Sequence, residues 1–237
     1  MGMDDPVAAA RVLVSERYAS ARWAMLAGSV LTAERTAGSD LDIVVLCDPT
    51  DGVPHRRSLR WRGWPVELFV HDPDSLAHYL ATDLARRQPS LPRMCATGVT
   101  VAGSDEEAER VRRECAAALA AGPAPLPAAE LDQLRYALTD ALDDLTHSAD
   151  AGESAVTAAA AWLRTAELAL HTAGRWLGTG KWLLRELRDC DPALAQRWLA
   201  ARGDAAAVAA LAREVLEAAG GPLFDGYHAA GDRTRPS

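Results

Sequence analysis

The sequence has little lysine and no closely spaced cysteines. Lys181 is the single lysine in a chain with 25 basic residues, so arginine supplies nearly all of the positive charge. The four cysteines, Cys47, Cys95, Cys115 and Cys190, form no CxxC pair and no Cys/His group at the spacing of metal ligands. We therefore expect reduced thiols and a cytoplasmic location.

The chain also lacks an excess of positive charge and a long apolar run. Its formal net charge is -8 at pH 7, so no general field is available to hold nucleic acid or an anionic membrane, and neither partner is expected. The same surface favours a small substrate that is itself cationic. Residues 1–6 contain no apolar signal core, and no run of residues reaches the length of a membrane span.

The hydrophobic pattern predicts an α+β protein with two domains. An N-terminal mixed-sheet domain is expected over residues 1–122, with strands at 23–27, 41–46, 55–61, 65–70 and 98–102 and helices at 6–18, 72–87 and from 104. Three prolines in the segment 122–127 indicate a linker. A helical bundle is expected over residues 128–222, with helices at 128–148, 154–172, 179–190, 192–201 and 204–219. The tail, 223–237, is expected to be loop-like, with disorder in its last residues.

A group of small and acidic residues in the first domain indicates a site for phosphates and metal ions. Gly28 and Ser29 follow a predicted strand, where a bare backbone and a hydroxyl can approach a phosphate. Asp40 and Asp42 are two positions apart at the next strand, so both carboxylates point to one face while Leu41 points to the core. Such a pair repels itself unless a cation lies between, which suits Mg²⁺ that also binds substrate phosphates.

Glu67, in a later apolar strand, is a candidate third carboxylate. Two metal ions held by three acids can stabilise both the attacking and the leaving oxygen of an in-line displacement. Each part alone has a simpler explanation, because Asp-x-Asp strings occur in turns and a strand glutamate often faces water. The order of the glycine-serine turn, the acidic pair and the third acid favours a functional site.

This order is similar to that of the polymerase-beta-like nucleotidyltransferase superfamily, and it looks most like the antibiotic-modifying branch of aminoglycoside, kanamycin and lincosamide nucleotidyltransferases. Those enzymes join an N-terminal mixed sheet to a C-terminal helical bundle. The similarity in sequence rests on residues 26–45 and 65–70.

The resemblance implies an enzyme with three catalytic acids, Asp40, Asp42 and Glu67, which bind two Mg²⁺ ions. It implies that Gly28 and Ser29 hold the terminal phosphates of ATP or another nucleoside triphosphate, and Ser39 also matches the usual motif. A hydroxyl of the acceptor would attack the α-phosphate and release pyrophosphate. Glu67 would serve as a metal ligand or as the general base.

The predicted helical domain contains further candidates. Lys181 lies beside a predicted helix start, where a cation is not favoured electrostatically, so we interpret it as a phosphate contact in the nucleotide site. Asp140 and Asp144 share one helix face, next to Asp143, and either line an acidic pocket for a cationic acceptor or form a solvated face. Glu167 is a further acidic candidate, and relatives that build the site across two subunits allow a homodimer.

The leading hypothesis is transfer of a nucleoside monophosphate, from ATP, to a hydroxyl of a small molecule such as an aminoglycoside-like antibiotic, which would confer antibiotic resistance. One alternative is transfer to a protein hydroxyl, as in nucleotidylating toxins and antitoxins. Another is a non-catalytic nucleotide-binding module. Arg164 and His171 have the R-x6-H spacing that resembles the ribonuclease motif of HEPN domains, which gives a fourth hypothesis.

Overall fold

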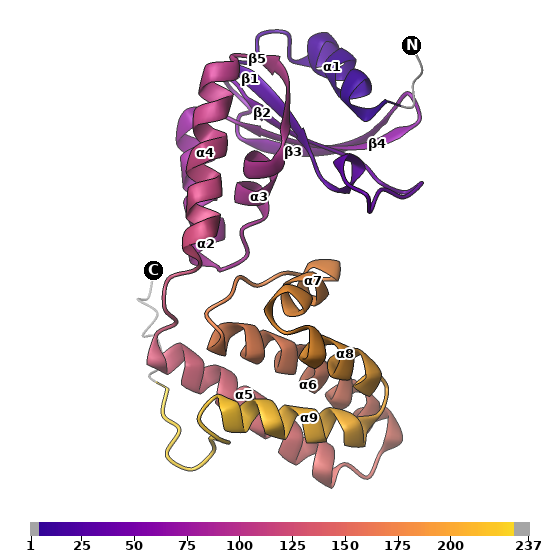
Figure 1. Cartoon of the computed structure of the whole chain (residues 1–237), viewed down its shortest axis with the longest axis vertical. Helices are drawn as coiled ribbons and strands as arrows, with labels where there is room; N and C mark the ends of the chain where they lie inside the picture. Colours follow the sequence, from indigo (N-terminus) through magenta and orange to yellow (C-terminus); the bar gives the residue numbers. More distant parts are fainter. Residues whose placement is uncertain (1–4, 230–237) are drawn as a thin grey trace. The chain divides into compact units, whose positions relative to one another are not determined.

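The computed structural model describes residues 5–229, and the chain divides into two compact units between Gly122 and Pro123. Figure 1 shows the first unit in indigo to magenta and the second in pink to yellow. The predicted α+β class is confirmed, because the first unit contains a five-stranded mixed sheet and the second is built of helices. Across residues 5–229, every helix is too short or too polar to cross a lipid bilayer.

The helices and strands of the first unit match the predicted ones to within a few residues. Its elements are α1 (Pro6–Arg17), β1 (Trp23–Ala27), the 3-10 turn η1 (Ser29–Leu31), β2 (Leu41–Leu46), β3 (His55–Trp61), β4 (Trp64–His71), α2 (Pro73–Ala85), α3 (Ser90–Thr97), β5 (Val99–Gly103) and α4 (Asp105–Ala121). The sequence pattern does not predict η1 or α3. In α3, Pro89 and Pro92 conceal the helical periodicity.

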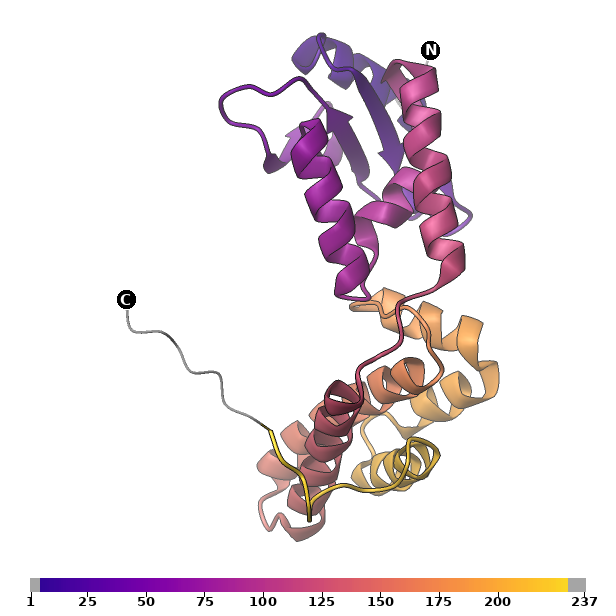
Figure 2. The ribbon, with the colours of Figure 1, turned by 90° about the vertical axis from the view of Figure 1, so that its left-hand side faces the viewer.

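The sheet has the strand order β3-β4-β2-β1-β5, and β2 pairs with β4 in parallel while the other pairs are antiparallel. Alternate residues of β2 and β4, including Ile43 and Leu68, pack against α1 on one face. The opposite face carries Val44 and Phe69, which belong to the layer formed with α2, α3 and α4. Figure 2 looks onto this second face, with α2 and α4 in front of the strands and α1 on the far side.

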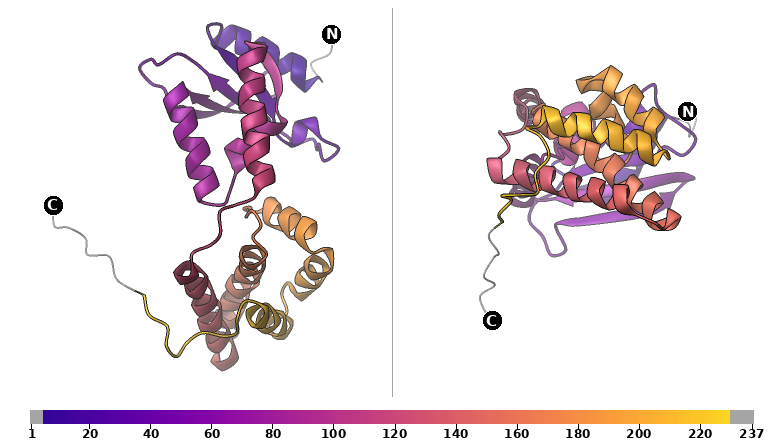
Figure 3. Two further views of the ribbon diagram at one scale, coloured as in Figure 1. Left: turned by 60° about the vertical axis from the view of Figure 1, so that its left-hand side comes forward. Right: turned by 90° about the horizontal axis from the view of Figure 1, so that it is seen from below.

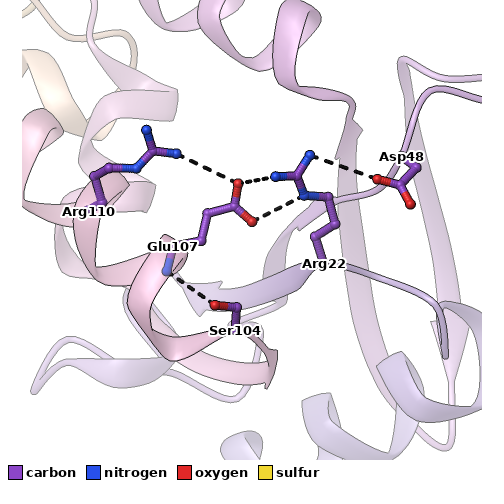
Figure 4. Close-up of polar contacts among 5 residues, drawn as sticks. All are labelled: Arg22, Asp48, Ser104, Glu107 and Arg110. Atoms are coloured by element: carbon purple, nitrogen blue, oxygen red, sulfur yellow. Dashed lines mark hydrogen bonds and ion pairs between the residues drawn. The ribbon is translucent and has the colours of Figure 1, made fainter.

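An ion-pair network joins the start of β1 to the start of α4 (Figure 4). Arg22 donates two hydrogen bonds to the Glu107 carboxylate, at 2.5 Å and 3.2 Å, and lies 3.8 Å from Asp48. Glu107 is in the first turn of α4, where its backbone N–H donates to the capping hydroxyl of Ser104. A carboxylate is favoured there by the helix dipole as well as by Arg22.

The second unit contains α5 (Ala128–His147), α6 (Ala151–Thr172), α7 (Lys181–Cys190), α8 (Pro192–Ala201) and α9 (Ala205–Ala218). Leucine and alanine side chains of α5, α6 and α9 form one core, and α5 and α9 lie side by side in the right-hand view of Figure 3. Trp162 and Trp198 join α6 to α8, because their rings stack at 3.8 Å and each indole N–H donates to the other residue's carbonyl.

The segment that follows α9 returns to α5. Arg135 donates to the carbonyl oxygens of Gly220 and Gly221, at 2.7 Å and 2.9 Å. Tyr136 stacks on Tyr227 with ring centroids 4.1 Å apart. These contacts bind the beginning of the expected tail to the bundle, whereas the disorder expected at its very end concerns residues 230–237, which lie outside the described part of the chain.

Replacing Glu107 with glutamine is expected to lower the free energy of unfolding by about 1–2 kcal/mol, because Arg22 keeps its charge but loses a charged partner that is only 18% exposed. Urea unfolding of the wild type and the variant measures the change. Glu214→Gln is the matched control, because Glu214 also accepts two hydrogen bonds from an arginine, Arg197, but both side chains are at least half exposed. Solvent screening should leave its stability unchanged, and equal losses in the two variants would contradict this assignment.

Candidate functional site

Gly28 ends β1 and lies directly against an aspartate of the next strand. Its φ of +89° is in a region that side chains disfavour, and a Cβ atom there would lie 2.2 Å from Oδ2 of Asp42. Both conditions require glycine. The bare backbone turns sharply into η1 and leaves room for the Asp42 carboxylate beside Ser29.

Two serine hydroxyls close the loop between Gly28 and the acidic pair. The Oγ atoms of Ser29 and Ser39 are 3.1 Å apart, and the backbone N–H of Thr36 donates to Ser39 Oγ at 3.0 Å. Ser39 is only 6% exposed. Its hydroxyl therefore positions Ser29 and the chain entering Asp40, while the direct contact with nucleotide expected of Ser39 stays a prediction.

The three predicted acids come together on one face of the sheet. Asp40 immediately precedes β2, Asp42 lies in β2, and the parallel register pairs Asp42 with Glu67 of β4. One carboxylate oxygen from each of the three lies within 4.8 Å of the others, and all three residues are half-buried. Carboxylates at this spacing are a suitable ligand set for a hard divalent cation such as Mg²⁺, which would offset their mutual repulsion.

Strand β3 adds two residues that the sequence reasoning did not identify. Arg56 Nη2 lies 2.6 Å from Glu67 Oε2, and Ser58 donates to Glu67 Oε1 at 3.3 Å. The guanidinium of Arg56 also lies over the Phe69 ring, 4.9 Å from its centroid. The only sequence signal was the presence of a basic residue in a predicted strand, because the antiparallel register that faces Ser58 towards Glu67 is a property of the folded sheet.

A pocket adjoins the acidic group on the same face of the sheet. It has a volume of about 330 Å³ and is lined by residues of β3, β4, α2 and α3 and their flanking loops: Pro54, His55, Arg56, Phe69, His71, Tyr79, Asp83, Ser90, Leu91 and Met94. The buried Nδ1 atom of His71 has no hydrogen-bond partner in the described part of the chain. The His71 ring lies 5.4 Å from that of Tyr79.

The candidate acids of the helical unit lie on its surface or at half depth. Asp140, Asp143 and Asp144 are exposed on α5, and Asp144 lines an open pocket of about 680 Å³ with Glu153 of α6, so both the acidic-pocket and the solvated-face alternatives stay open. Glu167 of α6 is half-buried, and burial raises the pKa of its carboxyl while nearby Arg164 lowers it. A role for these acids in binding an acceptor stays a prediction.

Lys181 and the R-x6-H pair also belong to the helical unit. Lys181 is the first residue of α7 and is exposed. Arg164, on α6, donates to the carbonyl oxygen of Ala137 on α5 at 3.3 Å, which makes it a link between two packed helices. The phosphate contact of Lys181 and the ribonuclease role of Arg164 with His171 stay predictions.

No model of a protein family matches the sequence, and a search of curated proteins found no relative. Among solved structures, the chain is similar to a nucleotidyltransferase-like protein from Exiguobacterium sibiricum. The similarity covers 92% of this chain and 77% of that one, with 12% sequence identity and a TM-score of 0.45. A likeness this distant supports no inference about activity.

Asp42→Asn should weaken the binding of a divalent cation at least tenfold, because it removes the central carboxylate of the three. Electron paramagnetic resonance of Mn²⁺, titrated into the protein as a substitute for Mg²⁺, measures this affinity. Asp140→Asn removes an exposed carboxylate of α5 and should bind Mn²⁺ as the wild type does. Unchanged Mn²⁺ affinity in Asp42→Asn, with circular dichroism showing a folded protein, would exclude the acidic group as the metal site.

His71 predicts a pH dependence of stability. Burial lowers its pKa below the ordinary value of 6.5, an effect that His55 reinforces and Asp72 opposes. Below about pH 6.5 the unfolded chain therefore binds a proton that the folded chain excludes, and the free energy of unfolding decreases as the pH falls. Urea unfolding between pH 7.5 and 5.5 should show a smaller decrease for His71→Phe than for the wild type, and identical pH dependences would contradict the assignment.

Proposed function

We propose that the protein is a Mg²⁺-dependent nucleotidyltransferase that moves a nucleoside monophosphate, AMP from ATP, to a hydroxyl of a small molecule. One observation carries the proposal. Asp40, Asp42 and Glu67 present carboxylate oxygens within 4.8 Å of one another, immediately beside the turn at Gly28 and Ser29. An acidic group beside a glycine-serine turn suits a metal-bound triphosphate, because the acids can hold the metal ions and the serine hydroxyl can donate to a phosphate.

Each part of this site has a separate task in the proposed reaction. Two Mg²⁺ ions bound by the acids would supply charge stabilisation for the attacking and leaving oxygens. Gly28 admits the Asp42 carboxylate to the turn, and Ser29, held by Ser39, keeps a hydroxyl beside the acids to donate to the terminal phosphates. Arg56 and Ser58 hold the Glu67 carboxylate in place, where it acts as a metal ligand or accepts the proton of the acceptor hydroxyl.

The resemblance to antibiotic-modifying enzymes makes aminoglycosides and lincosamides the first acceptors to test. The protein is incubated with Mg²⁺, ATP labelled at the α-phosphate and each compound, and labelled products are separated by chromatography. Asp40→Asn and Glu67→Gln should reduce transfer at least a hundredfold, because the loss of metal-held charge raises the activation free energy by several kcal/mol. Glu217→Gln, at an exposed position of α9, is the matched control and should retain transfer.

The other hypotheses predict different results in the same assay. Label on a protein band in cell lysate, with small molecules unmodified, would indicate a protein acceptor. ATP binding that is unaffected by Asp42→Asn and by removal of Mg²⁺ would indicate a non-catalytic nucleotide-binding module. Cleavage of RNA that is lost in His171→Ala but retained in Asp40→Ala would indicate a ribonuclease. Any of these outcomes, without labelled small-molecule product, would refute the proposal.

A further inference from the structure

The pocket lined by residues of β3, β4, α2 and α3 lies beside the acidic group formed by Asp40, Asp42 and Glu67. Glu67, Phe69 and His71 alternate along β4 and point to the same face, about 7 Å apart at each step. Arg56 belongs to both features, because it binds Glu67 and also lines the pocket beside Phe69. A molecule in the pocket would therefore lie next to the metal-binding acids.

The order of the strands relates this pocket to the side from which the acceptor would attack in the proposed reaction. In the sheet, β2 lies between β1 and β4, so Asp42 is flanked by the turn at Gly28 and Ser29 on one side and by Glu67 on the other. In a phosphoryl transfer, the attacking oxygen and the leaving group are in line on opposite sides of the phosphorus. If the pyrophosphate lies over Gly28 and Ser29, the attacking hydroxyl arrives from the side of Glu67 and the pocket. This step rests on the proposed function.

The walls of the pocket are unsuited to a polycation. Phe69, Tyr79, Leu91 and Met94 supply apolar and aromatic surface. The one carboxylate among the ten lining residues, Asp83, accepts a hydrogen bond from the backbone N–H of Leu91 at 2.8 Å. A cationic amine in this pocket would lose its hydration and lie near the guanidinium of Arg56, which is unfavourable. The pocket therefore favours a neutral acceptor over the cationic substrate that the net charge of the chain suggests, and over the aminoglycosides among the acceptors named above.

His71 contributes an imidazole ring to the wall of the pocket, and one of its ring nitrogens has no hydrogen-bond partner in the described part of the chain. The residue is 7% exposed, it lines the pocket, and its Nδ1 atom is buried without a hydrogen-bond partner. A buried polar atom in that state is destabilising unless a ligand or a water molecule satisfies it. Because Nδ1 is closed to solvent, a polar group on a bound molecule would supply this hydrogen bond only if the His71 ring turned towards the pocket.

We propose that this pocket binds the acceptor, and that the acceptor is an uncharged small molecule with an aromatic or other planar apolar ring and a nearby hydroxyl. The ring packs between Phe69, Tyr79 and Met94, and the hydroxyl reaches the acids. The acceptor oxygen forms a bond to the α-phosphorus while the bond from that phosphorus to pyrophosphate breaks. The hydroxyl proton passes to Glu67 or to water, and the products are the nucleotidylated acceptor and pyrophosphate.

The test uses tryptophol, a neutral indole alcohol, and kanamycin, a polycation, as probes of the full-length protein. Saturation-transfer NMR at millimolar probe concentration reports binding, with and without Mg²⁺ and a nonhydrolysable α,β-methylene ATP. Tryptophol should bind in both conditions, because acceptor and nucleotide occupy the site together. Kanamycin should not displace tryptophol from the pocket in either condition. Ser90→Trp, which places an indole at the exposed rim of the pocket, should reduce the tryptophol signal at least fivefold. Ser15→Trp, at an exposed position of α1 on the opposite face of the sheet, is the matched control and should leave it unchanged.

Three results would overturn the proposal. They are absence of a tryptophol signal, an undiminished signal in Ser90→Trp, and displacement of tryptophol by the nucleotide analogue, which would make the pocket a nucleoside site. Tyr79→Ala removes a ring instead of adding one and should also weaken binding, so a misfolded Ser90→Trp protein does not end the test. The proposed function is tested separately by the nucleotide analogue. If the analogue does not bind in the presence of Mg²⁺, the proposed nucleotide site is refuted, whatever the tryptophol signal shows.

Discussion

The parallel pairing of β2 with β4 is the constraint on which the acidic site depends. It places Asp42 directly opposite Glu67, although 25 positions separate their numbers in the chain. A slip of one residue in this register would turn Glu67 to the other face and bring Leu68 or Val66 into its place. The slip is unfavourable because it would bury the Glu67 carboxylate in the apolar layer that packs against α1.

The sequence pattern was sufficient for elements whose signal is local. Short apolar runs bounded by turn residues predicted β2 and β4, the prolines at 122–127 predicted a break between two kinds of structure, and the confirmed α+β class follows from these features. Asp40, Asp42 and Glu67 could be selected as site candidates because the order of residues alone shows a carboxylate at or beside an apolar strand. The structure adds that their oxygens converge.

The contacts that the sequence could not predict are those made between distant segments. In the sequence, nothing distinguishes Arg56 from the other arginines of its strand, and only the β3–β4 register shows that it lies beside Glu67. The hydrogen-bond distance between the Ser39 and Ser29 hydroxyls depends on how the loop between them folds. The pocket needs β3, β4, α2 and α3 together, and α3 was itself hidden by its prolines. Each case depends on which strands and helices become neighbours, and a local pattern does not contain that information.

Gly28 provides a way to recognise whether other chains of this architecture retain the site. The space that a side chain would occupy is filled by the Asp42 carboxylate, so alanine or any larger residue at that position would push the aspartate away from the other two acids. A chain could then keep every carboxylate and still lose the geometry for a metal ion. In a genome survey, the residue before the serine would therefore separate competent from degenerate copies better than a count of the acids.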